Sequence, residues 1–155
     1  MKQEETFDFH IKRTWQAIAR MYNEVAGQYG VSMATGFVLL NIDKKEGTPS
    51  TALGPKMGME ATSLSRLLRS MEEKDLIERR PNPQDGRGVL IFLTSFGIEK
   101  RKDAKAAVVN FNNQLFNRFS QEQSRTFFEV MELMYEWITT HQLELLNTEK
   151  TEHEK

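Results

Sequence analysis

The chain has 155 residues, of which 39% are hydrophobic and 28% charged, and its 21 basic and 22 acidic side chains leave a formal net charge of −1. This composition excludes wholesale disorder and suffices for a domain with a real core, and the absence of cysteine excludes disulfide scaffolds and thiolate metal sites. Taken alone, the near-neutral charge argues against a nucleic-acid partner.

Helices are predicted throughout the first half of the chain. Apolar residues recur every three or four positions over 7–25, which predicts an amphipathic helix, and a second helical segment follows the glycines that end it. Thr48-Pro49 combines a hydroxyl cap with proline at the first helical position, so a short helix is predicted over 49–57. A further helical stripe follows over 60–74.

The hydrophobic period then changes. Residues 76–80 and 89–93 read as strands, and turn-forming residues fill 81–88, which predicts a hairpin with a loop of about eight residues. Two long helices follow, the first opening at Thr94 and the second after a capping box at 120–123. The last helix carries too many apolar residues for one stripe, so we expect it to be buried on more than one side.

The short helix, the break at Gly58 and the helix after it form a candidate helix-turn-helix, and the hairpin is its candidate wing. In such a unit the second helix enters the major groove, where cations and short polar groups contact phosphates and base edges. Residues 61–71 contain no acid. The candidate DNA-contacting residues are Thr62, Ser63, Ser65, Arg66, Arg69, Arg79, Arg80 and Arg87.

These cations also have a plainer interpretation. A solvated helix face would pair Arg69 with Glu72 or Glu73, and an ordinary charged hairpin would explain the arginines of the wing. Residues 49–92 carry seven cations and six anions, so the regional charge does not decide between the two. The position of the anions, at the far end of the predicted recognition helix, favours a small basic surface.

Three motifs give a more specific indication. The run 64–79, then Asp85-Gly86-Arg87, then 93–97 resembles the MarR family of bacterial transcription regulators. The family pattern is a recognition helix ending in Leu-Glu-x-x-Gly-Leu-Ile-x-Arg, a wing with Asp-x-Arg, and Leu-Thr-x-x-Gly opening the next helix. The flanking helices match as well, so the resemblance covers nearly the whole chain.

The resemblance implies a mainly α fold with a small β-hairpin wing, in a single MarR-type chain over 1–155. Its winged helix-turn-helix DNA-binding lobe is expected over 34–97, its helical dimerisation region over 6–30 and 98–146, and a frayed tail over 147–155. It also implies that Arg87 enters the minor groove and that Asp85 braces the wing.

The chain departs from the family pattern at three places. Met71 stands where the pattern has leucine, which conserves volume. Asp75 replaces the usual glycine and must tolerate a left-handed backbone. Gly54-Pro55 interrupts the first helix of the motif and puts its length in question.

The predicted function is that of a sequence-specific transcriptional regulator that binds double-stranded operator DNA, a ligand-responsive repressor acting as a homodimer on a pseudo-palindromic operator. The alternative is a winged-helix protein-interaction module that does not bind DNA. The predicted dimer interface comprises Phe7, Ile11, Trp15, Met131, Met134, Trp137 and Ile138. A pocket for a small apolar or aromatic effector is predicted at Trp15, Phe37 and Phe111, although core and dimer contacts explain the same aromatic residues.

Other classes of function lack their motifs. The sequence has no phosphate-binding glycine loop, nucleophile elbow or plausible triad, so no enzyme and no cofactor are predicted. His10, His141 and His153 are far apart, so no metal site is predicted. The charged N-terminus and the lack of a long apolar stretch predict a cytoplasmic protein without a membrane segment.

Overall fold

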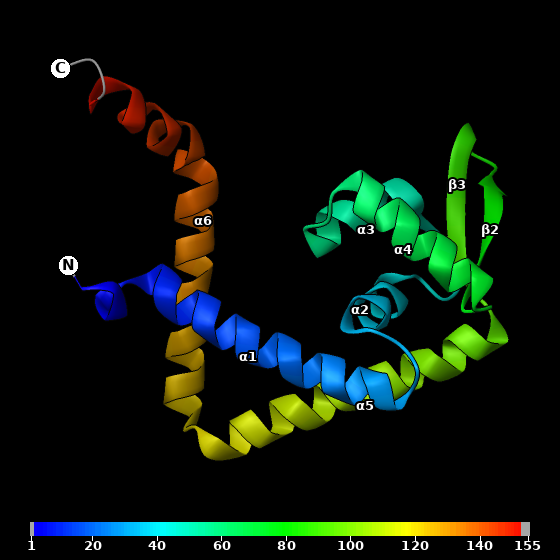
Figure 1. The fold of residues 1–155 in the computed structure, drawn as a ribbon, viewed down its shortest axis with the longest axis horizontal. Coiled ribbons are helices and arrows are strands. Elements are labelled where there is room, and N and C mark those ends of the chain that lie inside the picture. The colour runs from blue at the N-terminus through cyan, green and yellow to red at the C-terminus, as the bar shows by residue number, and fades with distance from the viewer. Residues whose placement is uncertain (1, 153–155) are drawn as a thin grey trace. The chain divides into compact units, whose positions relative to one another are not determined.

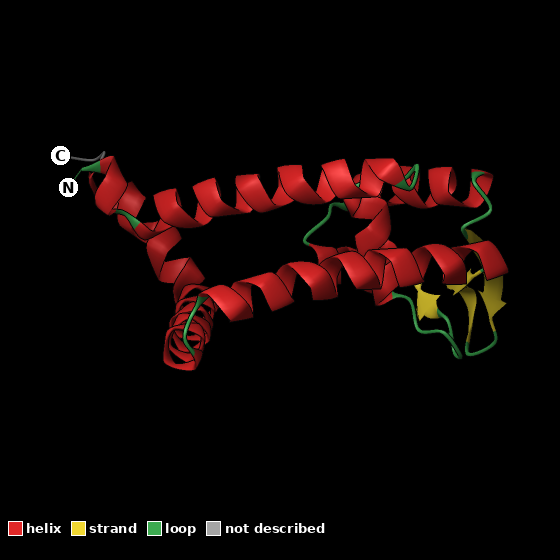
Figure 2. Cartoon of the chain, turned by 90° about the horizontal axis from the view of Figure 1, so that it is seen from below, coloured by secondary structure: helices red, strands yellow, loops and turns green. Residues whose placement is uncertain are grey.

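The computed structural model describes residues 2–152, except for the side chains of 86, 87 and 143–152. Helices dominate the fold, and three short strands form one antiparallel sheet (Figures 1 and 2). In chain order the elements are η1 (Gln3–Glu5), α1 (Phe7–Gln28), α2 (Met33–Asn41), β1 (Thr48–Pro49), α3 (Ser50–Met57), α4 (Ala61–Glu73), β2 (Ile77–Asn82), β3 (Asp85–Leu93), α5 (Ser95–Arg118) and α6 (Gln121–Glu152). The chain divides into two compact units, Met1–Val109 and Asn110–Lys155.

The core of the first unit lies beneath the predicted helix-turn-helix. It is built from side chains of α2, α3, α4, the sheet and the residues that adjoin them, namely Val38, Leu39, Ile42, Leu53, Leu64, Leu68, Met71, Leu76, Ile77 and Ile91. In Figure 1, α4 lies beside β2, with which it packs. Met71 is 1% exposed in this core, so the volume-conserving replacement of leucine is accommodated.

The turn of the helix-turn-helix is set by Gly58. Its φ of +60° is left-handed, and the Met59 N–H donates to the Gly54 carbonyl at 3.0 Å, which ends α3. Pro55 lies inside α3 and the helix continues only two residues beyond it. The first helix of the motif, whose length Gly54-Pro55 put in question, therefore has eight residues.

The start of this helix differs from the prediction. Thr48 and Pro49 form β1, which pairs with Ile91 and Leu90 of β3, so Thr48 does not cap α3. The Thr48 hydroxyl instead accepts the Asp43 N–H at 2.8 Å. The predicted cap was wrong because pairing with a distant strand outweighs the local helix signal.

The hairpin is also tighter than predicted. β2 and β3 extend into the expected loop of eight residues and leave only Pro83 and Gln84 between them. The register passes from Pro81 opposite Val89 to Asn82 opposite Asp85, so residues 86–88 bulge out of the ladder. Pro81 is compatible with this strand because β2 lies at the edge of the sheet.

The Leu-Thr-x-x-Gly motif joins α5 to the end of the recognition helix. The Thr94 hydroxyl accepts the Gly97 N–H at 2.9 Å and donates to the Asp75 carbonyl. A Cβ on Gly97 would lie 1.9 Å from the Leu76 carbonyl oxygen, so no side chain fits there. Asp75 has a φ of +57°, which confirms the left-handed conformation predicted for it.

The apolar side chains of α6, in the second unit, are more exposed than predicted. The capping box is confirmed, since Ser120 and Gln123 exchange hydrogen bonds of 2.9 and 3.1 Å, and α6 runs past residue 146 to Glu152. The predicted burial on more than one side is not found in the single chain, where Phe127, Leu133 and Trp137 are each more than half exposed. No helix among the described residues is long and apolar enough to cross a membrane.

Candidate nucleic-acid interface

Helix α4 presents a polar face opposite its buried one. Leu64, Leu68 and Met71 point into the core, because they recur at helical spacing. The other side carries the five residues predicted from the sequence, which are all exposed: Thr62, Ser63, Ser65, Arg66 and Arg69. The first acid of the helix is Glu72, in its last turn, so this face is free of negative charge over most of its length.

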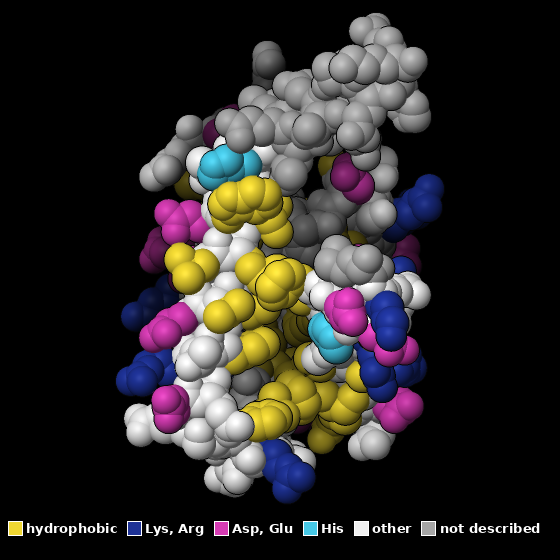
Figure 3. All heavy atoms as spheres, turned by 90° about the vertical axis from the view of Figure 1, so that its left-hand side faces the viewer, with side chains coloured by type: hydrophobic (Ala, Val, Ile, Leu, Met, Phe, Trp, Pro, Cys, Tyr) yellow, Lys and Arg dark blue, Asp and Glu magenta, His cyan; other side chains and the backbone are white. Residues whose placement is uncertain are grey.

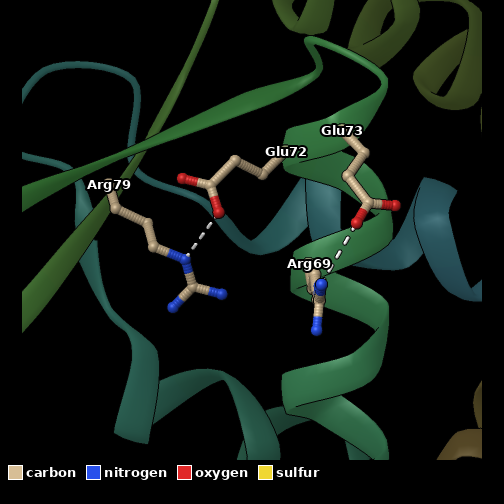
Figure 4. Close-up of polar contacts among 4 residues, drawn as sticks. All are labelled: Arg69, Glu72, Glu73 and Arg79. Atoms are coloured by element: carbon tan, nitrogen blue, oxygen red, sulfur yellow. Dashed lines mark hydrogen bonds and ion pairs between the residues drawn. The ribbon is translucent and has the colours of Figure 1, made fainter.

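Three of the predicted arginines are paired with carboxylates. Arg69 Nε lies 3.2 Å from Glu73 Oε1, one helical turn away, which is one of the pairings in the plainer interpretation. Arg79 Nε of β2 lies 3.0 Å from Glu72 Oε2. Figure 4 shows both pairs around the last turn of α4.

The third pair holds Arg80 against the sheet. Its guanidinium contacts the Glu78 carboxylate, with Nε at 2.9 Å from Oε1, and lies 4.2 Å from the centroid of the Phe92 ring. A carboxylate and an aromatic face together therefore hold the Arg80 guanidinium.

Arg66 is the exception among these arginines. It is exposed, and it makes no ion pair or side-chain hydrogen bond within the described part of the chain. A guanidinium without a protein partner keeps its five donors available to a base edge or a phosphate.

A groove runs between α3 and α4 and reaches Arg79. Hydroxyl groups line it at Ser50, Thr51 and Ser65. Ser50 and Thr51 are not among the residues predicted from the sequence, although their place in the first turn of a helix, where N–H groups are free, is a usable signal. They are additional candidates for phosphate contact.

The tip of the wing is described only in part. The side chain of Arg87 lies outside the described residues, so its predicted minor-groove contact stays a prediction. Asp85 opens β3 opposite Asn82, and its predicted bracing role likewise stays a prediction.

A small cavity of about 40 Å³ lies between α1, α2 and α5. Its wall is mostly apolar and includes Phe37 of the predicted effector pocket, whereas Trp15 is outside the lining and stacks on Phe37 with ring centroids 6.5 Å apart. Phe111 belongs to the second unit and does not line the cavity.

Polar groups border the same cavity. Lys100 Nζ lies 3.5 Å from Asp103 Oδ2 and 5.7 Å from the centroid of the Tyr29 ring. Burial raises the pKa of the Tyr22 phenol, which keeps this hydroxyl protonated. The described residues contain no cluster of His, Cys, Asp or Glu suited to a metal ion.

Large apolar side chains are exposed on both units. Of the seven residues in the predicted dimer interface, Met131 and Met134 are half-buried. The other five are exposed, with exposed fractions of 71% for Phe7, 39% for Ile11, 49% for Trp15, 52% for Trp137 and 47% for Ile138. Figure 3 shows hydrophobic side chains open to solvent on the face turned to the viewer. An isolated soluble chain seldom exposes so many large apolar groups.

A helix-turn-helix followed by a β-hairpin wing, here completed to a three-stranded sheet by β1, defines the winged-helix class of proteins. Residues 31–89 match the model of the MarR family. This match agrees with the MarR resemblance that the motifs predicted.

Individual relatives agree with this assignment. The chain is 28% identical to the HTH-type transcriptional regulator SarZ of Staphylococcus epidermidis over 109 residues, which cover 70% of this chain and 71% of SarZ. The fold is similar to that of MepR of S. aureus, solved as a DNA complex, with a TM-score of 0.78 and 20% identity over 86% of this chain and 98% of MepR. It is also similar to that of CouR from Rhodococcus jostii RHA1 bound to p-coumaroyl-CoA, with a TM-score of 0.75 and 22% identity over 86% and 94% of the two chains.

Proposed function

We propose that the protein is a sequence-specific transcriptional regulator that binds double-stranded operator DNA through α4 and the wing. The observation that carries the proposal is the exposed face of α4, which has no acid before its last turn and holds the unpaired guanidinium of Arg66. Arg66 reads a base edge or clamps a phosphate, and Thr62, Ser63 and Ser65 supply short polar contacts near the start of the helix. SarZ is itself named a regulator, and MepR is solved with DNA.

The proposal includes a homodimer in the bacterial cytoplasm. The exposed apolar residues of α1 and α6 are the surfaces that a second copy would cover. Two copies of one winged helix read two equivalent half-sites, which makes the operator pseudo-palindromic. Arg87 is assigned to the minor groove and Asp85 to bracing the wing.

We further propose that a small apolar or aromatic effector enters the cavity between α1, α2 and α5 and releases the repressor. Because the cavity of about 40 Å³ is small for such a molecule, we expect binding to move these helices apart. An effector that prefers the opened state shifts the population toward it, and this state misplaces the recognition helices. CouR holds p-coumaroyl-CoA, an example of a ligand in a protein of this fold.

Mobility shift with the intergenic DNA beside the protein's own gene tests the proposal. We expect the wild type to retain one duplex against excess random DNA, and Arg66→Ala to bind it about fivefold or more weakly, because a good arginine contact to a base contributes about 1–3 kcal/mol. Arg20→Ala, which removes an exposed charge from α1, is the matched control. Equal binding by Arg66→Ala and the wild type would refute the assignment of this site.

One observation favours the alternative, a protein-interaction module without DNA binding. Arg69, Arg79 and Arg80 are already paired with carboxylates of the same chain. Under this alternative the polar face of α4 meets a protein, and any binding to DNA is weak and insensitive to sequence.

A further inference from the structure

The two acids at the end of α4 form ion pairs with arginines that are proposed to contact DNA. Glu72 and Glu73 close the helix, and each holds a different arginine, Glu73 on the same helix and Glu72 across to β2. A phosphate group presents the same kind of acceptor to a guanidinium as a carboxylate does. DNA and these two glutamates therefore compete for Arg69 and Arg79.

The exposure of the pairs decides how strong this competition is. The Arg69 and Glu73 side chains are 80% and 65% exposed, and those of Arg79 and Glu72 are 34% and 43% exposed. Ion pairs this accessible to water are weak, so DNA phosphates can displace the carboxylates. The free energy of each ion pair that is lost is subtracted from the binding free energy that the new arginine–phosphate contact contributes.

We infer that Glu72 and Glu73 are built-in competitors of DNA phosphate that lower the affinity of the protein for DNA of any sequence. Binding to random DNA is driven almost wholly by phosphate contacts, so it is the interaction most reduced by this competition. Arg66 has no such competitor within the described residues and stays ready to contact DNA. The inference rests on the proposed function, because it assumes that this face meets DNA.

The competition also affects the salt dependence of binding. When Arg69 leaves Glu73 for a phosphate, the released carboxylate attracts a cation from solution, which offsets part of the counterion release that drives the binding. Removing the carboxylate charge removes this offset. Random-DNA binding by a Glu73→Gln variant should therefore depend more steeply on salt than that of the wild type.

The test is fluorescence anisotropy with a labelled duplex of random sequence, titrated at several salt concentrations. We expect Glu72→Gln and Glu73→Gln each to raise the affinity about two- to fivefold, and the double variant about tenfold, as the loss of exposed ion pairs allows. Glu24→Gln is the matched control, because it changes the net charge equally at an exposed site on α1 that has no ion pair among the described residues.

A double-mutant cycle separates competition from simple repulsion of DNA by the carboxylate. In an Arg69→Gln background, Glu73→Gln should no longer raise the affinity, because the arginine for which it competes is gone. Glu73→Gln is the safer variant for this cycle, since its highly exposed pair contributes little to folding, and equal melting temperatures verify this.

Three results would overturn the inference: no gain in either variant, an equal gain in Glu24→Gln, or a gain from Glu73→Gln that persists without Arg69. The proposed function fails in a different way. Tighter binding to random DNA without any preferred sequence would count against sequence-specific regulation only, whereas a preferred sequence without the gain would count against the competition only.

Discussion

Single residues at the junction of α4, β2 and α5 fix where the wing begins. Gly97 lies so close to the Leu76 carbonyl that only a hydrogen atom fits, and Thr94 bonds to both Gly97 and Asp75. The sequence predicted Thr94 as the start of a helix and a left-handed Asp75. It could not supply the reason for Gly97, because the Leu76 carbonyl approaches it only in the folded chain.

The close approach at Gly97 gives a stability prediction. Gly97→Ala should lower the free energy of unfolding by about 3 kcal/mol or more, because the methyl group has no space and the backbone must shift. Gly27→Ala is the control, since its Cβ meets nothing within 4 Å and alanine favours the helix. Urea denaturation measures both, and a Gly97→Ala variant as stable as Gly27→Ala would contradict the packing described.

At the scale of elements, α5 holds the end of α2 through Arg101. Its guanidinium donates to the Leu39 carbonyl and, at 2.7 Å, to that of Ile42, where α2 has run out of its own N–H partners. The chain then turns at Asp43, whose carboxylate accepts the N–H groups of Glu46 and Lys45, and these bonds lower the pKa of Asp43. The turn leads directly into β1 and the helix-turn-helix.

Removing the Arg101 guanidinium should therefore loosen the first unit. Arg101→Met keeps the packing of the stem but deletes both donated hydrogen bonds, and we expect a loss of about 2 kcal/mol, typical of bonds to a charged donor at a partly buried site. Lys102→Met, at an exposed neighbouring position, should change the stability by less than about 0.5 kcal/mol. Equal stability of the two variants in urea would show that Arg101 does not hold α2.

The helices of this fold were predictable and the sheet was only partly so. Periodicity marked α1, α4 and α6 because amphipathic helices carry their signal within a few turns. β1 has two residues and exists only by pairing with β3, so no local pattern could indicate it. The sequence could indicate the local Arg69–Glu73 pair, one helical turn apart, but not the pair of Arg79 with Glu72, which forms only when β2 packs beside α4.

At the scale of the whole molecule, the apolar residues left exposed on α1 and α6 predict self-association. Sedimentation equilibrium at micromolar concentration should give about 36 kDa, twice the mass of the 18.0 kDa chain. Trp137→Asp should shift the mass toward the monomer, because it places a charge among exposed apolar side chains. Arg125→Asp, a substitution of an exposed charged residue on the same helix, should not. A wild type that sediments at 18 kDa would contradict the proposed homodimer.

The net charge of −1 argues against a nucleic-acid partner only as a total, because a total does not report how charges are placed. Basic side chains gather on α4 and β2, and the acids there are paired to them. The central claim is that this surface binds DNA through its phosphates and bases.

The most direct test of that claim is the salt dependence of binding to the intergenic duplex beside the protein's own gene. The account predicts that the logarithm of the binding constant falls linearly and steeply with the logarithm of salt concentration, since every arginine–phosphate contact releases counterions. Binding that does not change with salt, or no binding to this duplex at low salt, would contradict it.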